Sequence, residues 1–400
     1  MKSAIGFYRK IYLRTNIKPG LITLALGGLT IGMTEFMMMG LLPDISKTLD
    51  ISIPTAGHLI SIYALGVVVG APLMTFLSAA YQPRKVLMML MLMFTLFNTL
   101  FALAPGFETL LIARFFAGLP HGAFFGIGAV VASKLAEPGR EARSIAVMFS
   151  GLTLANIIGV PLGTYLGHNY SWRFSFFLIA LVAFLAAASI RYWMPDTNTQ
   201  GRDQFKAGFS VFKKTNFWLI LLITAIGTGG LFAWISYIAP LMTEVAGFNA
   251  NSVSMIMIIA GVGMAVGNFL GGMLADRFSP TKAVAALLVT MTITLILVAL
   301  FSHYKPIALV LTFVTGAVAF AIAPSIQMLM INTAKGAEML ASSMIQASFN
   351  VGNTLGAFLG GLPIAAGFGY RSPEYVGALM AFGGFVICSI LMRRLRARTP

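Results

Sequence analysis

Leu21–Pro43, LITLALGGLTIGMTEFMMMGLLP, is a long apolar stretch whose one charged residue is Glu35. It matches the length of roughly 20 residues that an α-helix needs to cross a bilayer. Glu35 lies eight residues before Pro43, about 12 Å along a helix, which is too deep for its short side chain to reach the membrane surface. A charged group at the bilayer centre costs roughly 2.5–3.5 kcal/mol on insertion scales, so this acid indicates a function rather than a surface position.

Met38 and Met39 follow Glu35 by three and four residues, so they share its face of the predicted helix. Methionine side chains are flexible and polarizable, and they adapt to irregular surfaces. We therefore predict that this face lines a binding site in which Met38 and Met39 contact the substrate.

The whole chain has the composition of an integral membrane protein. Of its 400 residues, 58% are hydrophobic and only 10% are charged, whereas soluble domains carry about 25% charged residues. The single cysteine, Cys388, excludes an intramolecular disulfide. The first 18 residues are polar and basic, and the apolar run after them exceeds the roughly 7–15 residues of a signal-peptide core, so we expect no cleaved signal.

Apolar runs between charged or Pro/Gly breaks predict twelve membrane spans. They cover residues 19–43, 55–77, 84–105, 108–133, 143–167, 174–194, 216–240, 252–275, 281–302, 306–332, 339–366 and 374–392. The net charge of +15 could suggest a nucleic-acid partner, but 22 of the 27 Lys and Arg residues fall in the terminal segments and in alternate loops on one side. This imbalance places both termini in the cytoplasm of a bacterial inner (plasma) membrane, and no nucleic-acid partner is expected.

A shift of 197 residues aligns the two halves of the chain. It lays Gly32 on Gly229 and Pro43 on Pro240, and it carries Gly, Pro and Asn through four helix pairs. Six spans separate the copies, so the halves have the same orientation and are related by an axis along the membrane normal. The expected domains are an N-terminal six-helix bundle over 1–195, a cytoplasmic linker over 196–215 and a C-terminal six-helix bundle over 216–400.

Several motifs resemble those of major facilitator transporters. The loop GGMLADRFSPTK (Gly271–Lys282) resembles their Gly-x-Leu-Ala-Asp-Arg motif, and TFLSAAYQPRK (Thr75–Lys85) resembles a degenerate first copy with Ala79 in place of the aspartate. The run GLTLANIIGVPLGTYLG over residues 151–167 is similar to the fifth-helix motif of antiporters, although Val160 separates its Gly from its Pro. The resemblance implies gating roles for four residues, Asp276, Arg277, Gly159 and Pro161.

Other runs resemble a narrower group. Arg114, in LLIARFFAGLPHG, resembles the fourth-helix arginine of proton-coupled members. The segments 31–43, 52–72, 119–134 and 350–361 are similar to the arabinose-efflux (AraJ-like) group of the drug:proton antiporter branch. The resemblance implies an all-α integral membrane protein with twelve transmembrane helices in two parallel, pseudo-symmetric six-helix bundles, the major facilitator fold.

In that fold, helices one, four, seven and ten line a central cavity, so Glu35 and Arg114 are expected to face each other. A movable arginine could switch the acid between its ionised and protonated forms, which would make a proton relay; a static ion pair is the structural alternative. His121 lies two turns deeper on the Arg114 face. It could pass a proton or bind substrate, or it could be a neutral histidine bonded to a carbonyl.

The second half supplies polar and aromatic groups in its predicted spans but no charge in their interior. We therefore expect coupling to reside in the first half, and we expect the other carboxylates, Glu374 among them, to lie in water at helix ends or in loops. Hydrogen bonding between helices is the alternative role for the polar candidates. Together with Met38 and Met39, the candidate substrate contacts are Asn156, Trp234, Tyr237, Gln327, Gln346, Asn350 and Asn353.

These features predict a monomeric, proton-coupled secondary transporter that exports a small organic solute, a sugar or sugar-like compound, by alternating access. The expected partners are that solute, protons and the lipid bilayer. No phosphate loop, metal cluster or nucleophile constellation is found in the sequence, so we expect no cofactor, no metal and no enzymatic activity. The alternatives are a multidrug:proton antiporter, a passive sugar facilitator, and a membrane sensor or scaffold that does not transport.

Overall fold

The computed structural model describes residues 18–51, 53–196, 209–249 and 252–397, which are helical apart from short connections. The first half contains α2 (Pro19–Leu49), α3 (Ile53–Ser78), α4 (Pro83–Leu103), α5 (Phe107–Leu135), α6 (Glu141–Leu154), η1 (Ala155–Gly159), α7 (Val160–Asn169) and α8 (Trp172–Trp193). The second half contains η2 (Phe209–Lys213), α10 (Thr215–Gly227), α11 (Gly229–Ser236), α12 (Ile238–Pro240), η3 (Leu241–Val245), α13 (Val253–Arg277), α14 (Pro280–Phe301), α15 (Lys305–Thr333), α16 (Glu338–Ala365) and α17 (Ser372–Arg396).

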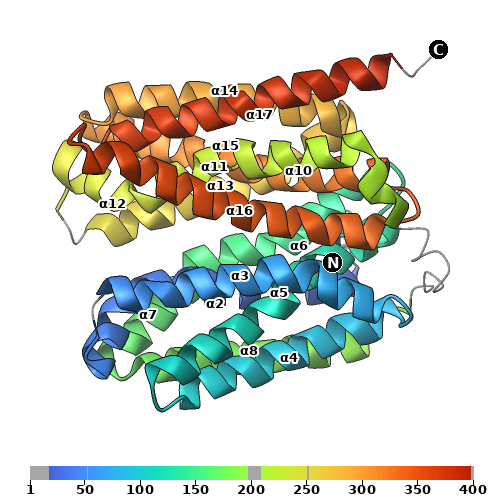
Figure 1. Cartoon of the computed structure of the whole chain (residues 1–400), viewed down its shortest axis with the longest axis horizontal. Coiled ribbons are helices and arrows are strands. Elements are labelled where there is room, and N and C mark those ends of the chain that lie inside the picture. Colours follow the sequence, from blue (N-terminus) through green and yellow to red (C-terminus); the bar gives the residue numbers. More distant parts are fainter. Residues whose placement is uncertain (1–17, 52, 197–208, 250–251, 398–400) are drawn as a thin grey trace, which may run out of the picture.

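The predicted fold class is confirmed. Eleven stretches of the described residues are helical, long and apolar enough to cross a membrane, with α6 to α7 and α10 to α11 each forming one span. The remaining predicted span is α16, whose polar residues lower its hydropathy. Figure 1 shows the two bundles one above the other, α2 to α8 below and α10 to α17 above.

Prolines mark where many of these helices begin. Pro19, Pro83, Pro280 and Pro373 each occupy the first turn of a helix, where a missing N–H costs no hydrogen bond. Pro161 also lies in the first turn of a helix, α7, but this turn is inside the fifth span, where the missing N–H removes one hydrogen bond of the helix. The chain passes this point through the π-helical turn η1, in which the N–H of Val160 donates to the carbonyl of Ala155.

Glycines allow pairs of helices to touch through their backbones. A Cβ atom on Gly66 or Gly70 of α3 would lie 2.2 Å from a carbonyl oxygen of α5. The equivalent glycines of the second half, Gly263 and Gly267 of α13, approach α15 in the same way, with 2.2 and 1.7 Å to carbonyl oxygens. Close approach maximises van der Waals contact between helices in a membrane. The internal repeat thus encodes the same crossing twice.

The bundles are held together at one end of the molecule. This end carries Arg84, Lys85, Lys134, Arg191 and Lys282, and we call it the basic end. There α16 lies along α3 and α5, and α13 lies along α6. Inter-bundle hydrogen bonds lie on this side: for example, the Thr75 hydroxyl donates to the Ser343 hydroxyl at 2.8 Å, and the Asn268 amide donates to the Ala146 carbonyl at 2.6 Å.

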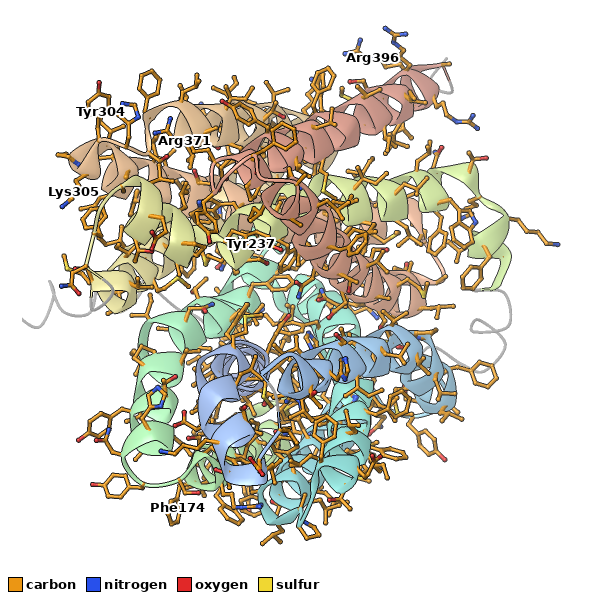
Figure 2. All side chains as sticks on the ribbon, turned by 60° about the vertical axis from the view of Figure 1, so that its left-hand side comes forward. Phe174, Tyr237, Tyr304, Lys305, Arg371 and Arg396 are labelled. Carbon is orange, nitrogen blue, oxygen red and sulfur yellow. The ribbon has the colours of Figure 1, made fainter. Side chains whose placement is uncertain are left out.

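The outward-facing side chains of the bundles are large and apolar. Phe174 and Tyr304, labelled in Figure 2, point away from the molecule and are 57% and 53% exposed. Each bundle keeps a separate buried core of Leu, Ile, Met and Phe side chains. An apolar rim around two apolar cores is what a bilayer requires, because lipid tails solvate these side chains as well as the core does.

Candidate functional site

A cavity of about 80 Å³ lies between the two bundles. Its wall is mostly apolar, with four polar side chains, as is usual for ligand pockets. The lining comes from α2, α5, α6, α11, α13, α15 and α16 and consists of Glu35, Phe36, His121, Phe149, Leu152, Leu231, Phe232, Ile235, Met264, Ala319, Phe320, Ala323, Gln346, Phe349 and Asn350.

Glu35 is half-buried on α2 and lines this cavity. Its neighbours Thr34 and Met38 are fully buried within the bundle, whereas Met39, one turn beyond Glu35, is 45% exposed. Among the residues that the structure describes, no cation lies within ion-pairing distance of the Glu35 carboxylate. The acid is therefore available to a proton or a ligand entering the cavity.

Arg114 is enclosed behind the cavity wall and is only 1% exposed. Its Nε donates to the carbonyl of Leu59 at 3.3 Å, and both terminal nitrogens approach the carbonyl of Thr34 at 3.5 Å. The guanidinium lies 4.3 Å from the centre of the Tyr63 ring and 5.6 Å from that of Phe101. The expected face-to-face pair with Glu35 is thus replaced by carbonyls and aromatic rings, although Arg114 contacts the residue next to Glu35.

Tyr63 connects this arginine to the histidine of the cavity wall. Its hydroxyl lies 3.0 Å from Nδ1 of His121, in a hydrogen bond buried between α3 and α5. His121 is 3% exposed and also packs against Phe125, with 5.4 Å between ring centres. The sequence suggested a carbonyl as the partner of a structural histidine, and the structure supplies a tyrosine hydroxyl instead. Tyr63, Arg114 and His121 form one buried polar cluster, which contacts the carbonyl of Thr34, the residue before Glu35.

Two of the predicted substrate contacts, Gln346 and Asn350, line the cavity. They lie one turn apart on α16, and the Asn350 amide donates to the Gln346 carbonyl at 3.0 Å. The side-chain nitrogen of Gln346 is buried and has no partner among the described residues. It is therefore free to donate a hydrogen bond to a bound solute.

The other candidates lie elsewhere. Met38 and Trp234 are fully buried in the cores of their bundles, and Met39 is exposed beyond the cavity. Gln327 donates to the Ser342 hydroxyl at 2.6 Å, and the Tyr237 hydroxyl donates to the Ala357 carbonyl at 2.8 Å, so both tie helices together. Asn156 donates to the Leu152 carbonyl within its own helix, at 3.1 Å, and Asn353 is half-buried outside the cavity lining.

The sequence reading missed the aromatic part of the cavity wall. Phe36, Phe149, Phe232, Phe320 and Phe349 all line it. The internal repeat contained a usable signal, because the shift of 197 residues lays Glu35 on Phe232, Phe149 on Gln346 and Leu152 on Phe349. Applying the repeat to Glu35 alone would have identified the facing residue of the second bundle.

A second acid, Glu374 in the first turn of α17, is fully buried. Neither of its carboxyl oxygens has a hydrogen-bond partner in the described part of the chain. This corrects the expectation that every carboxylate other than Glu35 lies in water. The residue was assigned to a span end, and span ends cannot be distinguished from buried first turns by hydropathy alone.

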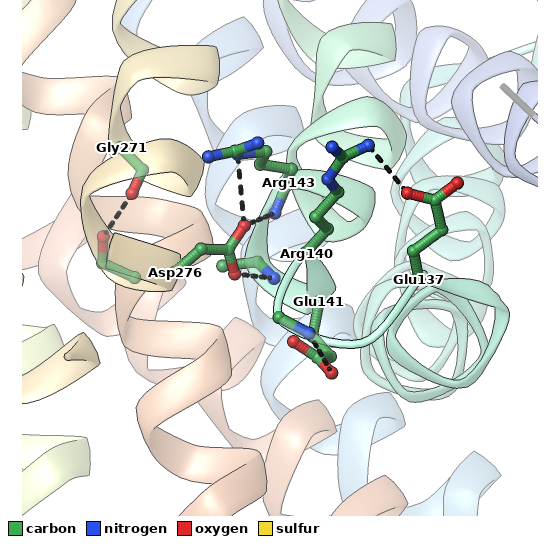
Figure 3. A network of polar contacts seen from close by, with 9 residues as sticks. Glu137, Arg140, Glu141, Arg143, Gly271 and Asp276 are labelled. Atoms are coloured by element: carbon green, nitrogen blue, oxygen red, sulfur yellow. Dashed lines mark hydrogen bonds and ion pairs between the residues drawn. The ribbon is translucent and has the colours of Figure 1, made fainter. Parts of the chain in front are cut away.

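At the basic end, Asp276 joins the two bundles (Figure 3). Its side chain, on the last turn of α13, accepts hydrogen bonds from the backbone N–H groups of Ala142 at 2.8 Å and Arg143 at 3.2 Å. The Arg143 side chain lies 3.5 Å from the same carboxylate. Because α6 begins at these N–H groups, an acid placed there also interacts favourably with the helix dipole. We call this set of contacts the Asp276 latch.

The remaining gating candidates occupy different positions. Arg277 is exposed, with its guanidinium 5.4 Å from the ring of Phe278. Gly159 lies in the π-helical turn against Met33 of α2, whose Cγ would be 2.5 Å from an added Cβ. Pro161 follows that turn and is exposed. The π-helical turn thus lies beside the helix that carries Glu35.

Comparison with known proteins agrees with this architecture. The sequence profile of the Major Facilitator Superfamily matches residues 24–262 and 235–400. The "Putative transporter AraJ" of Escherichia coli (strain K12) is 38% identical over 389 residues, 96% of this chain and 98% of that protein. A "Chloramphenicol resistance protein" of Streptomyces lividans is 29% identical over 365 residues, 90% of this chain and 93% of that one. The solved E. coli fucose:proton symporter FucP shares the fold, with a TM-score of 0.76 at 17% identity over 93% of this chain and 98% of that one.

Proposed function

Because this chain belongs to the Major Facilitator Superfamily, whose members are transporters and not enzymes, we propose that it exports a small organic solute in exchange for protons. It does so as a monomer in the bacterial inner membrane, since one chain supplies both bundles and the cavity between them. The observation that carries the proposal is Glu35, an acid that faces the cavity without a paired cation among the described residues.

The polar cluster beside that acid supports the proposal of proton coupling. A cavity-facing carboxyl takes up a proton from one side of the membrane and releases it when its surroundings change. Arg114 contacts the carbonyl of Thr34, the residue before Glu35, and reaches His121 through Tyr63. Through these contacts a change of charge at Glu35 can alter the positions of α3 and α5, the helices that pack against the second bundle at the basic end.

The cavity wall favours an amphipathic solute. Five phenylalanines and Met264 offer apolar surface, whereas Glu35, His121, Gln346 and Asn350 offer hydrogen bonds at opposite sides. A sugar exposes a hydroxyl on nearly every carbon and needs a partner for each when it leaves water, because unpartnered polar groups cost about 1–3 kcal/mol. We therefore favour a compound with one broad apolar face, and we keep a pentose as the second candidate because of the resemblance to the arabinose-efflux group.

Alternating access is the mechanism that we propose, with the two bundles rocking around the cavity. The Asp276 latch and the Thr75–Ser343 contact close the path at the basic end. Met39 lies one turn beyond Glu35 on α2, further from the basic end, and is 45% exposed. This exposure fits an access path from the end of the molecule opposite the basic end.

The decisive experiment uses purified protein in proteoliposomes, with and without an imposed pH gradient. Chloramphenicol and arabinose serve as probes of the two solute classes. We expect the gradient to drive accumulation of the apolar probe, with little accumulation of arabinose. Equal accumulation with and without the gradient would make the protein a passive facilitator, and accumulation of arabinose alone would make it a sugar exporter. Binding without transport of either probe would favour a sensor.

We also propose that the basic end faces the cytoplasm, since cytoplasmic loops are enriched in Lys and Arg. A reporter that fluoresces only when it folds in the cytoplasm should be active when fused to Met1 and also when fused to Pro400. Loss of signal from either fusion would contradict the proposed topology with an even number of spans.

A further inference from the structure

A second hollow is separate from the central cavity. It has a volume of about 900 Å³ and lies on the outer side of the first bundle, at the basic end, between the end of α3, the start of α4 and the end of α8. Its floor is apolar and rich in methionine, with Met74, Met88, Met89 and Met93. We call it the methionine groove.

Three cations stand at the rim of the methionine groove: Arg84 and Lys85 in the first turn of α4, and Arg191 in the last turn of α8. Arg84 is already engaged, with 3.0 Å between one terminal nitrogen and the Asp196 carboxylate, and it also donates to the Arg191 carbonyl. Lys85 and Arg191 are exposed, and their side chains pair with no acid among the described residues. The rim is therefore positively charged and open.

The two parts of the groove lie at the depths of the two parts of a phospholipid. The cations are at helix ends, where the headgroup region of a bilayer begins, whereas Met93 lies eight residues further along α4, about 12 Å into the hydrocarbon. Met74 and Leu77 of α3 form the facing wall, and Leu77 is 57% exposed. An acyl chain can lie along this wall with its phosphate between Lys85 and Arg191.

The loop beside the groove explains why the charge is not neutralised internally. The repeat aligns this region with the loop of the second bundle, in which Asp276 supplies an acid, but Ala79 stands at the equivalent position here. The segment from Phe76 to Lys85 contains no acid at all. Within the described part of the chain, Asp196 is the one acid of the groove lining, and it pairs with Arg84. The membrane is a nearby source of a negative group for Lys85 and Arg191.

We propose that the methionine groove is a binding site for an anionic phospholipid of the leaflet at the basic end. The lipid places one acyl chain on the methionines and its phosphate between Lys85 and Arg191. Basic pockets between transmembrane helices on the cytoplasmic side favour anionic headgroups. The proposal does not depend on what the central cavity transports.

The test is native mass spectrometry of the purified full chain in detergent, titrated with phosphatidylglycerol or with phosphatidylcholine of identical acyl chains. We expect the parent protein to bind phosphatidylglycerol roughly thirtyfold more tightly, since Lys85 and Arg191 contribute about 1 kcal/mol each and about 1.4 kcal/mol is a factor of ten. The double variant Lys85→Gln/Arg191→Gln should bind both lipids within about twofold of each other. Both side chains are exposed, so the variant should fold.

Lys282→Gln is the matched control, because the repeat lays Lys85 on this equally exposed lysine of the second bundle. It should keep the preference for phosphatidylglycerol. A second pair, Met88→Ser/Met93→Ser, should weaken both lipids alike and leave their ratio unchanged, since it alters only the acyl wall. Equal binding of the two lipids by the parent, an unchanged preference in the Lys85/Arg191 variant, or an equal loss in Lys282→Gln would overturn the site.

Discussion

At the residue scale, Glu35 and Arg114 do not form the ion pair that the sequence suggested, and each has surroundings of its own. The positive charge of Arg114 is stabilised by the carbonyls of Leu59 and Thr34 and by the Tyr63 ring, so the side chain can remain buried without a carboxylate partner. Cation–π contacts of desolvated cations are worth up to about 2 kcal/mol, which helps to hold the guanidinium there. Glu35 is left to interact with whatever enters the cavity.

Replacing Glu35 by glutamine tests this division. The amide keeps the shape and a hydrogen bond but cannot carry a proton, so Glu35→Gln should abolish accumulation driven by a pH gradient while leaving solute binding within a few-fold of the parent. Proton release on addition of solute to the purified protein is the direct measurement. Glu108→Gln, at an exposed acid of α5, is the control and should behave as the parent does. Undiminished proton release by Glu35→Gln would move the carrier role elsewhere, first to His121.

Glu374 presents the opposite situation, a fully buried acid whose oxygens have no partner among the described residues. Each buried polar group left without a hydrogen bond costs about 1–3 kcal/mol. Glu374→Met removes both oxygens at similar length, so the variant should melt at a higher temperature in detergent. Glu244→Met, at an exposed acid of the same bundle, should give no such gain. A lower melting temperature for Glu374→Met would mean that the carboxyl has a stabilising partner.

Sequence reasoning identified polar residues at the cavity more easily than aromatic ones. Glu35 and His121 of the cavity wall, and Arg114 behind it, could be singled out because a polar residue in an apolar run is conspicuous, and their roles stay predictions. Phe36, Phe149 and Phe320 could not, because phenylalanine is equally at home facing lipid, a helix core or a cavity. Trp234 and Gln327 were assigned to the substrate for the converse reason, since polarity alone does not distinguish a helix contact from a ligand contact.

At the scale of elements, the packing of helices at the glycine crossings is sensitive to the addition of a single Cβ atom. The Cβ of Gly267→Ala would lie 1.7 Å from the Ala317 carbonyl oxygen, so α13 would have to move away from α15. Overpacking of this kind costs about 1–3 kcal/mol, and the melting temperature should fall. Gly57→Ala is the matched control in α3, because nothing lies within 4 Å of its added Cβ, and removing a helical glycine gains up to about 1 kcal/mol. Equal effects of the two substitutions would argue against the close crossing.

Helix positions were predictable because both hydropathy and the repeat report on them. The predicted spans 84–105 and 281–302 agree with α4 and α14 to within a few residues. Breaks inside spans were harder to predict: the seventh span is divided at Thr228 and Tyr237, and the fifth passes through η1. These breaks depend on which carbonyls neighbouring helices satisfy, and that information is absent from a single helix sequence.

At the scale of the whole molecule, closure at the basic end depends unequally on the two bundles. The Asp276 latch holds α13 to the first turn of α6. The repeat lays Ala79 on Asp276 and Met339 on Ala142. Ala79 and Met339 line a common void of about 10 Å³. The equivalent latch in the first bundle therefore lacks its acid, and Leu340 stands in place of Arg143.

The asymmetry predicts how the population of states responds to two substitutions. Asp276→Asn replaces one accepting oxygen by an amide group beside N–H donors, so it should open the basic end. Adding Ala79→Asp to that variant supplies a carboxylate that can accept from the first turn of α16, so it should close the end again. Charge-assisted hydrogen bonds are roughly twice as strong as neutral ones, so each change should shift the open population several-fold.

A cysteine in place of Ala347 reports on this equilibrium, because that buried residue lies one turn from Ser343, which bonds to the first bundle. The native Cys388 is fully buried, so it should not react with the reagent. Labelling by a thiol reagent from the basic side should rise in Asp276→Asn and return toward the parent rate with Ala79→Asp. Ala80→Asp, at the exposed neighbouring position, should not rescue, because this residue does not line the void. If labelling stays constant in all three variants, the latch does not control access, and the basic end is kept closed by the apolar contact between the bundles. If Ala80→Asp restores the parent rate as well as Ala79→Asp does, the effect comes from net charge and not from the position of the carboxylate.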